Sequence, residues 1–251
     1  MPHPTIKMSP EIPPQSTEIF RRSRINEHGH TYYAYRHWLT DEEAGREALS
    51  RSPEFRREDL EEMTVQELEL VEIDIIRDFL KRPDTQEAIE QGRMTLGIIK
   101  PAVNEGVNFP KNIHSDHHSA RYIVERFIEP AWIPEGILVQ FAVPLSPEQA
   151  QKLYVEHQGK KFFEDLIDYI SSGPVTFLLL YDESGRAVER WRHIMGATDP
   201  KQADFESIRG THAPSLEHNL VHGSDSRESA AQEIGLFVEI LEDWHDFLQS
   251  K

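Results

Sequence analysis

Cysteine is absent from this chain of 251 residues. Without cysteine the protein can form no disulfide and no thiolate metal site, and it has no thiol nucleophile. The chain also lacks any apolar run close to the ~20 residues that a membrane-spanning helix needs. Its N-terminus is rich in proline rather than basic and then apolar, which is not typical of a signal peptide. We therefore expect a cytoplasmic protein without a membrane partner.

Basic residues are also few, because 27 Lys and Arg stand against 44 Asp and Glu, which gives a formal net charge of −17. A surface that coats nucleic acid is usually basic, so we expect no nucleic-acid partner. A nucleotide site remains compatible with this charge, because a few converging cations are enough to bind phosphates.

The N-terminal third divides into two parts. Residues 1–39 form a Pro-rich arm and an aromatic segment with little periodicity. Residues 40–93 predict a mostly helical extension, with capping-box pairs at Thr40 and Thr64 and a helix stop at Pro83. An apolar stripe recurs there at helical spacing and consists of Leu68, Val71, Ile75, Ile76, Phe79 and Leu80. We expect this stripe to pack on the rest of the chain, with a subunit interface or a cap over a cleft as alternatives.

From residue 94 to residue 251 strand and helix patterns alternate. The predicted strands are 94–99, 137–143, 175–181 and 219–222, and the predicted helices are 115–129, 162–171, 186–195, one capped by Ser146 and one starting near Ser226. This order predicts an α/β fold, a ferredoxin-like sandwich in which helices cover a four-stranded antiparallel sheet.

A histidine near the C-terminus is the strongest candidate for a catalytic residue. The run 219–221 leads His222 into a Gly-Ser-Asp-Ser turn, and a helix follows. Imidazole is nucleophilic when neutral, and its ordinary pKa of about 6.5 leaves much of it neutral at physiological pH. Ser224 and Glu233 are candidates to hydrogen-bond the ring and to fix its tautomer. A neutral imidazole can accept a phosphoryl group and divide one difficult transfer into two easier ones.

Three cations could converge on a polyphosphate: Lys100, Arg192 and Arg209. An arginine fork matches phosphate oxygens in pairs, whereas lysine acts as a point charge. Transfer of a γ-phosphoryl group needs little beyond in-line positioning and stabilisation of the phosphate charge. These residues therefore indicate phosphoryl transfer.

The same residues, taken in order, resemble the nucleoside diphosphate kinase family. The resemblance covers about 94–238 and includes the segment 154–163, Ile208-Arg209-Gly210 and the motif around His222. It implies a nucleoside diphosphate kinase-like domain in residues 94–251, with a C-terminal helix. It also implies a ping-pong reaction, in which a nucleoside triphosphate phosphorylates His222 and a nucleoside diphosphate then takes the group.

The resemblance further implies how a nucleotide is bound. Arg192, Arg209 and Thr198 would contact the β- and γ-phosphates, and Lys100 and Asn219 the sugar hydroxyls and the transferred group. Tyr154 would hold Lys100, and Phe162 would stack on the base. The phosphates would hold Mg²⁺, so no metal site built from protein ligands is expected. The family also implies a dimer-based homo-oligomer.

Some features of the sequence depart from this family. Ala102 and Val103 stand where an acidic residue and a glycine are usual, and an insertion of about residues 104–115 follows. Two alternative functions stay open: a regulatory, non-enzymatic nucleotide-binding relative, and a protein-histidine phosphotransferase that uses the same His222.

Overall fold

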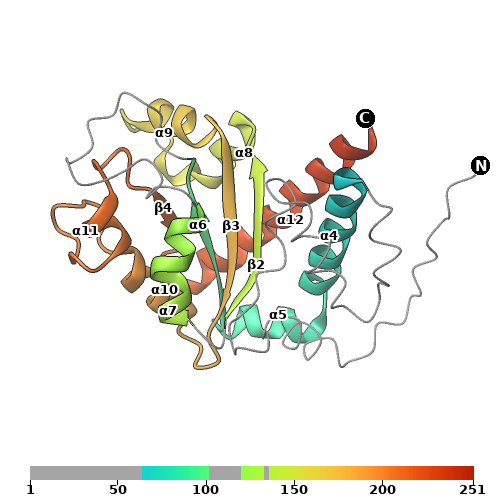
Figure 1. Ribbon diagram of the computed structural model, residues 1–251, viewed down its shortest axis with the longest axis horizontal. Helices are drawn as coiled ribbons and strands as arrows, with labels where there is room; N and C mark the ends of the chain where they lie inside the picture. The colour runs from blue at the N-terminus through green and yellow to red at the C-terminus, as the bar shows by residue number, and fades with distance from the viewer. Residues whose placement is uncertain (1–63, 102–119, 133–135) are drawn as a thin grey trace, which may run out of the picture.

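The computed structural model describes residues 64–101, 120–132 and 136–251. In these residues four strands form one antiparallel sheet in the order β2-β3-β1-β4 (Figure 1). The strands are β1 (Met94–Ile99), β2 (Ile137–Pro144), β3 (Pro174–Tyr181) and β4 (Val221–Gly223). The sheet and its covering helices confirm the predicted ferredoxin-like sandwich.

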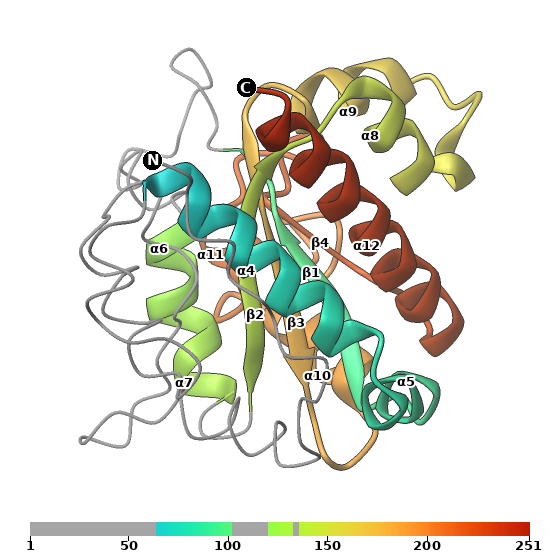
Figure 2. The same cartoon turned by 90° about the vertical axis from the view of Figure 1, so that its right-hand side faces the viewer.

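Helices cover both faces of the sheet (Figures 1 and 2). One face carries α4 (Val65–Leu80), α5 (Pro83–Glu90) and the long α12 (Arg227–Gln249). Helix α8 (Pro147–Leu153) packs beside the C-terminal half of α12, and α9 (Phe163–Ile170) packs against α8. A 3-10 turn, η3 (Val155–His157), follows α8. The other face carries α6 (Ala120–Ile123), the π-helix η2 (Val124–Ile128), α7 (Glu129–Trp132), α10 (Ala187–Met195) and α11 (Ile208–His212).

The central strand β3 has buried apolar side chains on both faces. Phe177 and Leu179 belong to a core cluster with α12, whereas Leu178 and Leu180 belong to a second cluster with α10. Phe177 stacks on Phe237 of α12 with ring centroids 4.7 Å apart. This double burial explains why β3 reads as a continuous apolar run rather than as an alternating pattern.

Helix α4 packs against α12 (Figure 2). The predicted capping box is present, because the Thr64 hydroxyl and the Glu67 carboxylate each accept a hydrogen bond from the other residue's backbone N–H. The helix was predicted to stop at Pro83, and it ends at Leu80. Pro83 itself is the first residue of the next helix, α5.

The buried face of α4 differs from the predicted apolar stripe. Ile76, Phe79 and Leu80 are buried as expected, but Val71 and Ile75 are only half-buried. The buried face also includes residues outside the stripe, namely Glu69, Glu72 and Ile73. The Leu68 side chain lies outside what the structure describes. The prediction erred because Glu69 bonds Trp244 on α12, a pairing that local periodicity cannot show.

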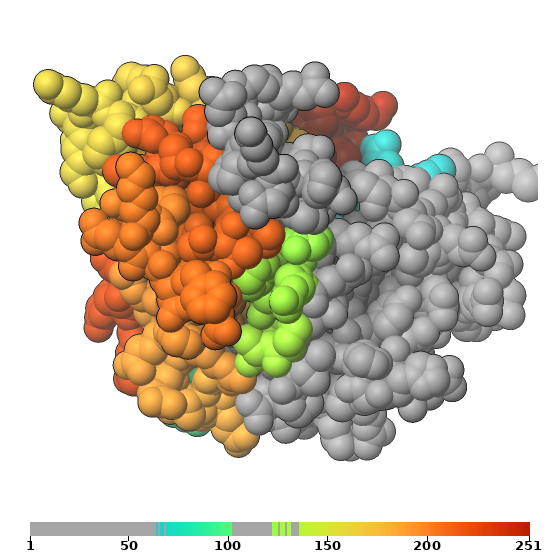
Figure 3. Space-filling model, turned by 60° about the vertical axis from the view of Figure 1, so that its left-hand side comes forward, coloured from blue at the N-terminus to red at the C-terminus, as the bar shows by residue number. Residues whose placement is uncertain are grey.

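On the opposite side, α11 and the segment before it lie at the surface beside α6 and α7 (Figure 3). His212 of α11 makes edge contacts with the rings of Tyr122 and Phe127, at 5.3 Å in each case. Of the predicted helix 115–129, the described residues from Ala120 onward are helical. The arm 1–39, the Thr40 helix and the insertion 104–115 lie outside the described residues.

The predicted strand 219–222 is shorter than expected, because β4 begins only at Val221. Leu220 has a φ of 66°, and the Asn219 carbonyl accepts a hydrogen bond of 2.8 Å from the Val221 N–H. This is a γ-turn of the rare kind with positive φ, which excludes Asn219 and Leu220 from the strand. Among the described residues no helix is long and apolar enough to cross a membrane.

Candidate active site

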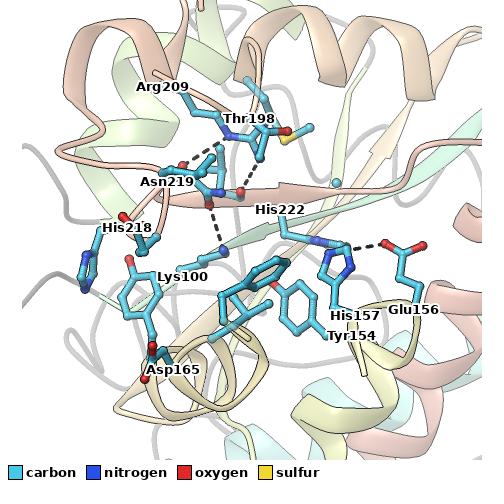
Figure 4. A pocket seen from close by; sticks show the side chains of 18 of the residues that line it. Lys100, Tyr154, Glu156, His157, Asp165, Thr198, Arg209, His218, Asn219 and His222 are labelled. Atoms are coloured by element: carbon cyan, nitrogen blue, oxygen red, sulfur yellow. Dashed lines mark hydrogen bonds and ion pairs between the residues drawn. The ribbon is translucent and has the colours of Figure 1, made fainter. Parts of the chain in front are cut away.

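A cavity of about 920 Å³ lies at the end of β1 and along β4 (Figure 4). All the residues predicted to bind the nucleotide, together with His222, line it: Lys100, Tyr154, Phe162, Arg192, Thr198, Arg209, Asn219 and His222. Ser224 and Glu233 do not line the cavity but lie behind His222, where both are bonded into one network. The structure thus brings the predicted site residues together from segments far apart in the sequence.

His222 lies in the middle of β4, paired with Ile98 of β1, and its side chain is 16% exposed. Its Nε2 is 3.0 Å from Oε1 of Glu233, and the Ser224 hydroxyl donates to Oε2 of the same carboxylate at 2.7 Å. A carboxylate only accepts hydrogen bonds, so Nε2 carries the proton of the neutral ring. The lone pair is then on Nδ1, which makes Nδ1 the nucleophilic nitrogen.

The backbone of His222 is fixed by Trp191, a residue that the sequence analysis did not single out. The indole N–H of Trp191 donates to the His222 carbonyl at 3.0 Å. The ring also lies so close to Gly223 that a Cβ at this position would overlap it. Glycine at position 223 therefore permits the contact that holds the strand carrying the histidine.

Lys100 follows β1 and is 5% exposed. Its ammonium donates to Oδ1 of Asn219 at 2.8 Å and lies 5.6 Å from the ring centroids of both Tyr154 and Tyr169. Burial, with a further contribution from the charge of Arg209, lowers the pKa of Lys100 to about 7. The site thus holds an amine that changes charge near neutral pH.

Arg209 on α11 anchors the polypeptide around the cavity. Its guanidinium donates to the carbonyls of Gly196 at 2.9 Å, Val221 at 2.8 Å and Asn219 at 3.3 Å. These bonds use three of the five N–H donors of a guanidinium, so the anchoring is compatible with phosphate contacts. Burial lowers the pKa of Arg209 to about 10, and the nearby charge of Arg192 contributes to the same shift.

Two tyrosines surround the lysine and one of them also contacts the histidine. The Tyr154 ring meets His222 edge-on, with centroids 5.2 Å apart. Burial, and then the charge of Glu233, raises the pKa of Tyr154 far above its ordinary value. The Tyr154 hydroxyl is buried and has no hydrogen-bond partner within the described residues. Tyr154 therefore contacts Lys100 through its ring face and not through its hydroxyl.

The outer part of the cavity is more exposed and apolar. Phe162 precedes α9 and is 45% exposed, and Leu216 is 51% exposed. Both residues line the cavity. Exposed apolar side chains inside a polar cleft indicate a surface for a flat apolar group, such as a nucleotide base.

Several residues that line the cavity were missed by the sequence analysis: Glu156, His157, Asp165, Asp168, Tyr169, Glu217, His218 and Asp225. Asp165 and Tyr169 follow Phe162 by three and seven residues, a helical spacing that could have revealed them. No such signal exists for His218, because its position depends on the turn before β4. Within the described residues no group of three or more His, Asp and Glu side chains could hold a metal ion.

Comparison with known proteins identifies the same family as the sequence motifs. The family model for nucleoside diphosphate kinase matches residues 93–242. A nucleoside diphosphate kinase of the Wolbachia of Brugia malayi is 39% identical over 143 residues, which covers 57% of this chain and 91% of that protein. One from Desulfovibrio desulfuricans is 50% identical over 98 residues, or 39% of this chain and 69% of that protein. A solved Aquifex aeolicus nucleoside diphosphate kinase is 30% identical, covers 58% of this chain and 94% of its own, and has a TM-score of 0.47. This chain belongs to the nucleoside diphosphate kinase family.

Proposed function

We propose that this protein transfers the γ-phosphoryl group of a nucleoside triphosphate to a nucleoside diphosphate through a phosphohistidine on His222. Membership of the nucleoside diphosphate kinase family supports this reaction. The observation that carries the residue assignment is the bond between Nε2 of His222 and Glu233, which leaves Nδ1 as the nucleophile in a cavity lined by cations.

The reaction has two steps at one nitrogen. Nδ1 of His222 attacks the γ-phosphorus, a nitrogen–phosphorus bond forms, and the bond from the γ-phosphorus to the bridging oxygen breaks, which releases the nucleoside diphosphate. The proton on Nε2 stays in its hydrogen bond to Glu233, whose negative charge stabilises the imidazolium that forms. In the second step a terminal β-phosphate oxygen of another nucleoside diphosphate attacks the phosphorus, and the bond to Nδ1 breaks.

The cations and donors around the cavity would stabilise the charge on the phosphates. Arg192, Arg209 and Thr198 are proposed to contact the β- and γ-phosphates. Lys100 and Asn219, already joined at 2.8 Å, are proposed to contact the sugar hydroxyls and the transferred group. Because Lys100 has a pKa of about 7 in the free protein, bound phosphates would favour its charged form.

The base would stack on Phe162, with Leu216 as a second apolar wall. Stacking reads no hydrogen-bonding edge, so such a site accepts purines and pyrimidines alike. Mg²⁺ would enter with the nucleotide and take most of its ligands from phosphate oxygens, and Asp225, which lines the cavity, offers a further oxygen. A dimer-based homo-oligomer, a cytoplasmic location and the division of the chain at residue 93 also remain part of this proposal.

Labelling with γ-³²P-ATP tests the reaction. The protein should become labelled, and addition of GDP should move the label rapidly to GTP. His222→Ala should lose the label and lower turnover by about 10⁴-fold or more, as expected when a covalent nucleophile is removed. His193→Ala, which changes an exposed histidine on α10, is the matched control.

The label should be acid-labile and stable to base. An unlabelled wild-type protein would indicate a regulatory relative, and a labelled protein that does not discharge to GDP would indicate a protein-histidine phosphotransferase. Labelling of the His222→Ala variant would refute the residue assignment.

A further inference from the structure

His157 lies between the buried and the exposed aromatic residues of the cavity, and nothing above gives it a role. Its ring is stacked on Tyr154, with centroids 5.9 Å apart and an angle of 20° between the planes. On its other side the His157 ring contacts the Phe162 ring, with centroids 5.5 Å apart and an angle of 68° between the planes. Tyr154 is 3% exposed, whereas Phe162 is 45% exposed. His157 thus connects a buried ring to a ring that is nearly half exposed.

Lys160 completes this arrangement. Its ammonium is 2.9 Å from Nδ1 of His157 and 5.8 Å from the centroid of the Phe162 ring. An ammonium can only donate, so Nδ1 accepts and the ring proton is on Nε2, 3.6 Å from Oε1 of Glu156. The backbone supports the same geometry, since the His157 N–H donates to the Tyr154 carbonyl and the Lys160 N–H to the His157 carbonyl.

We propose that His157, as a neutral imidazole that accepts a hydrogen bond from Lys160, is a positioning residue that holds Phe162 in place as the platform for the nucleotide base. This inference rests on the proposed function for the identity of the ligand. It adds His157 to the residues that serve that function. It also adds the requirement that this histidine, which lies outside the phosphate site, is neutral when Phe162 binds the base.

The charges around His157 agree with a neutral ring. Burial first, and then the positive charge of Lys160, lowers the pKa of His157, and His222 contributes in the same direction. Glu156 acts in the opposite direction, but its side chain is 66% exposed and its effect is weakened by solvent. The neutral form therefore persists to lower pH than is usual for histidine.

Protonation would undo the arrangement. A proton on Nδ1 removes the acceptor for Lys160 and places a second positive charge next to the ammonium. Lys160 would then move away, and Phe162 would lose the ammonium that lies near its ring. Affinity for a nucleotide should accordingly fall as the pH decreases through the lowered pKa of His157.

Two substitutions each remove one of the two features of His157, the acceptor or the ring. His157→Phe keeps an aromatic ring between Tyr154 and Phe162 but cannot accept from Lys160. His157→Asn keeps an acceptor close to the position of Nδ1 but has no ring. Calorimetric dissociation constants for ADP, CDP and inorganic tripolyphosphate, measured from pH 8 to pH 5, provide the test, since tripolyphosphate carries no base.

Both variants should bind ADP and CDP at least about 5-fold more weakly at pH 8, the lower end of what loss of a stacked base costs. Tripolyphosphate should bind as it does to the wild type, and the decrease in ADP affinity toward acid pH should be smaller in both variants. Wild-type affinity in either variant, or an equal loss for tripolyphosphate, overturns the inference.

Lys160→Met tests the same arrangement from the other side, because it leaves the His157 ring unchanged and removes the exposed ammonium that donates to Nδ1 and lies near the Phe162 ring. In this variant, too, ADP affinity should decrease less toward acid pH than in the wild type. A decrease as large as that of the wild type would also overturn the inference. These binding measurements need no turnover. A failure of ATP to label His222 would therefore count against the proposed function and not against the role of His157.

Discussion

Lys100 lies between two tyrosine rings and is itself nearly closed to water, and its pKa is about 7. At pH 8 the amine of the free protein is therefore mostly neutral. Phosphates favour the ammonium form and raise its pKa again, so binding of ADP at this pH should take up a fraction of a proton that approaches about one.

Calorimetry of ADP binding in buffers of different ionisation enthalpy measures this uptake. Lys100→Met removes the titrating group and should abolish most of it. An uptake that is the same in the variant would assign the proton to another residue.

Phe162 is the second residue whose role leads to a prediction. If it stacks on the base, Phe162→Ala should weaken binding by about 1–3 kcal/mol, and to a similar extent for purine and pyrimidine nucleotides. Dissociation constants for ADP, GDP, CDP and UDP check this. Phe205→Ala, at an exposed phenylalanine that does not line the cavity, should have no effect. A loss confined to one base would contradict stacking.

At the scale of elements, the contact between α4 and α12 contains a buried carboxylate. The Trp244 indole donates to Glu69 at 2.7 Å, yet burial still raises the pKa of Glu69 above its ordinary value. A raised pKa in the folded state means that ionised Glu69 destabilises the fold at neutral pH. This cost is fully present above the raised pKa of the folded state, and it disappears as the pH falls from that pKa to the ordinary value of a carboxyl group.

Glu69→Gln keeps an acceptor for Trp244 and removes the charge. It should raise the melting temperature at pH 7.5, and the gain should shrink toward pH 4.5. Glu164→Gln, at an exposed glutamate on α9, is the control and should change little. A variant less stable than the wild type at pH 7.5 would show that the charge of Glu69 is needed.

The sequence allowed some elements to be predicted better than others. Strands β1, β2 and β3 were predicted almost to the residue, because continuous apolar runs between turn residues have few other solutions. The start of β4 was not predicted correctly, because nothing in the sequence indicates that Leu220 has a positive φ. The buried side of α4 was misjudged because Glu69 finds its partner on a helix about 175 residues away.

The residues of the site also differ in how well they could be predicted. Residues with their own motif, such as His222 and Arg209, could be identified from the sequence. Trp191 and His218 could not, because their positions follow from how α10 and the γ-turn pack in three dimensions. The carbonyl bonds of Arg209 were equally invisible, since they join three separate stretches of backbone.

At the scale of the whole molecule, α12 joins α4 to the sheet. Ile73 and Ile76 of α4 are fully buried in the cluster that contains Ile240 and Leu241 of α12, and Arg77 binds Glu242 at 3.1 Å. Each such apolar side chain contributes roughly 1.5–3 kcal/mol when buried. An isolated helix of this length is marginal in water, so α4 depends on these contacts.

A protein that starts near Arg93 would expose the apolar face of α12. It should still be phosphorylated on His222, because every residue with a proposed phosphate or nucleophile role lies at or beyond Lys100. It should also aggregate or change its subunit number, as light scattering beside the full-length protein would show. An unchanged size and solubility would contradict the docking, and a folded but unphosphorylated product would place the extension in the active site.

The contact between Trp191 and Gly223 has a consequence for how substitutions in this protein should be interpreted. The indole lies against Gly97 as well, where an added Cβ would be 2.9 Å from the ring. Positions 97 and 223 should therefore tolerate replacement as poorly as position 222, although neither glycine has a side chain that could take part in the reaction. A survey that ranks positions only by loss of activity would place these glycines beside the nucleophile. A substitution at position 222 should abolish activity and leave the melting temperature nearly unchanged. A substitution at position 223 should abolish activity and also lower the melting temperature.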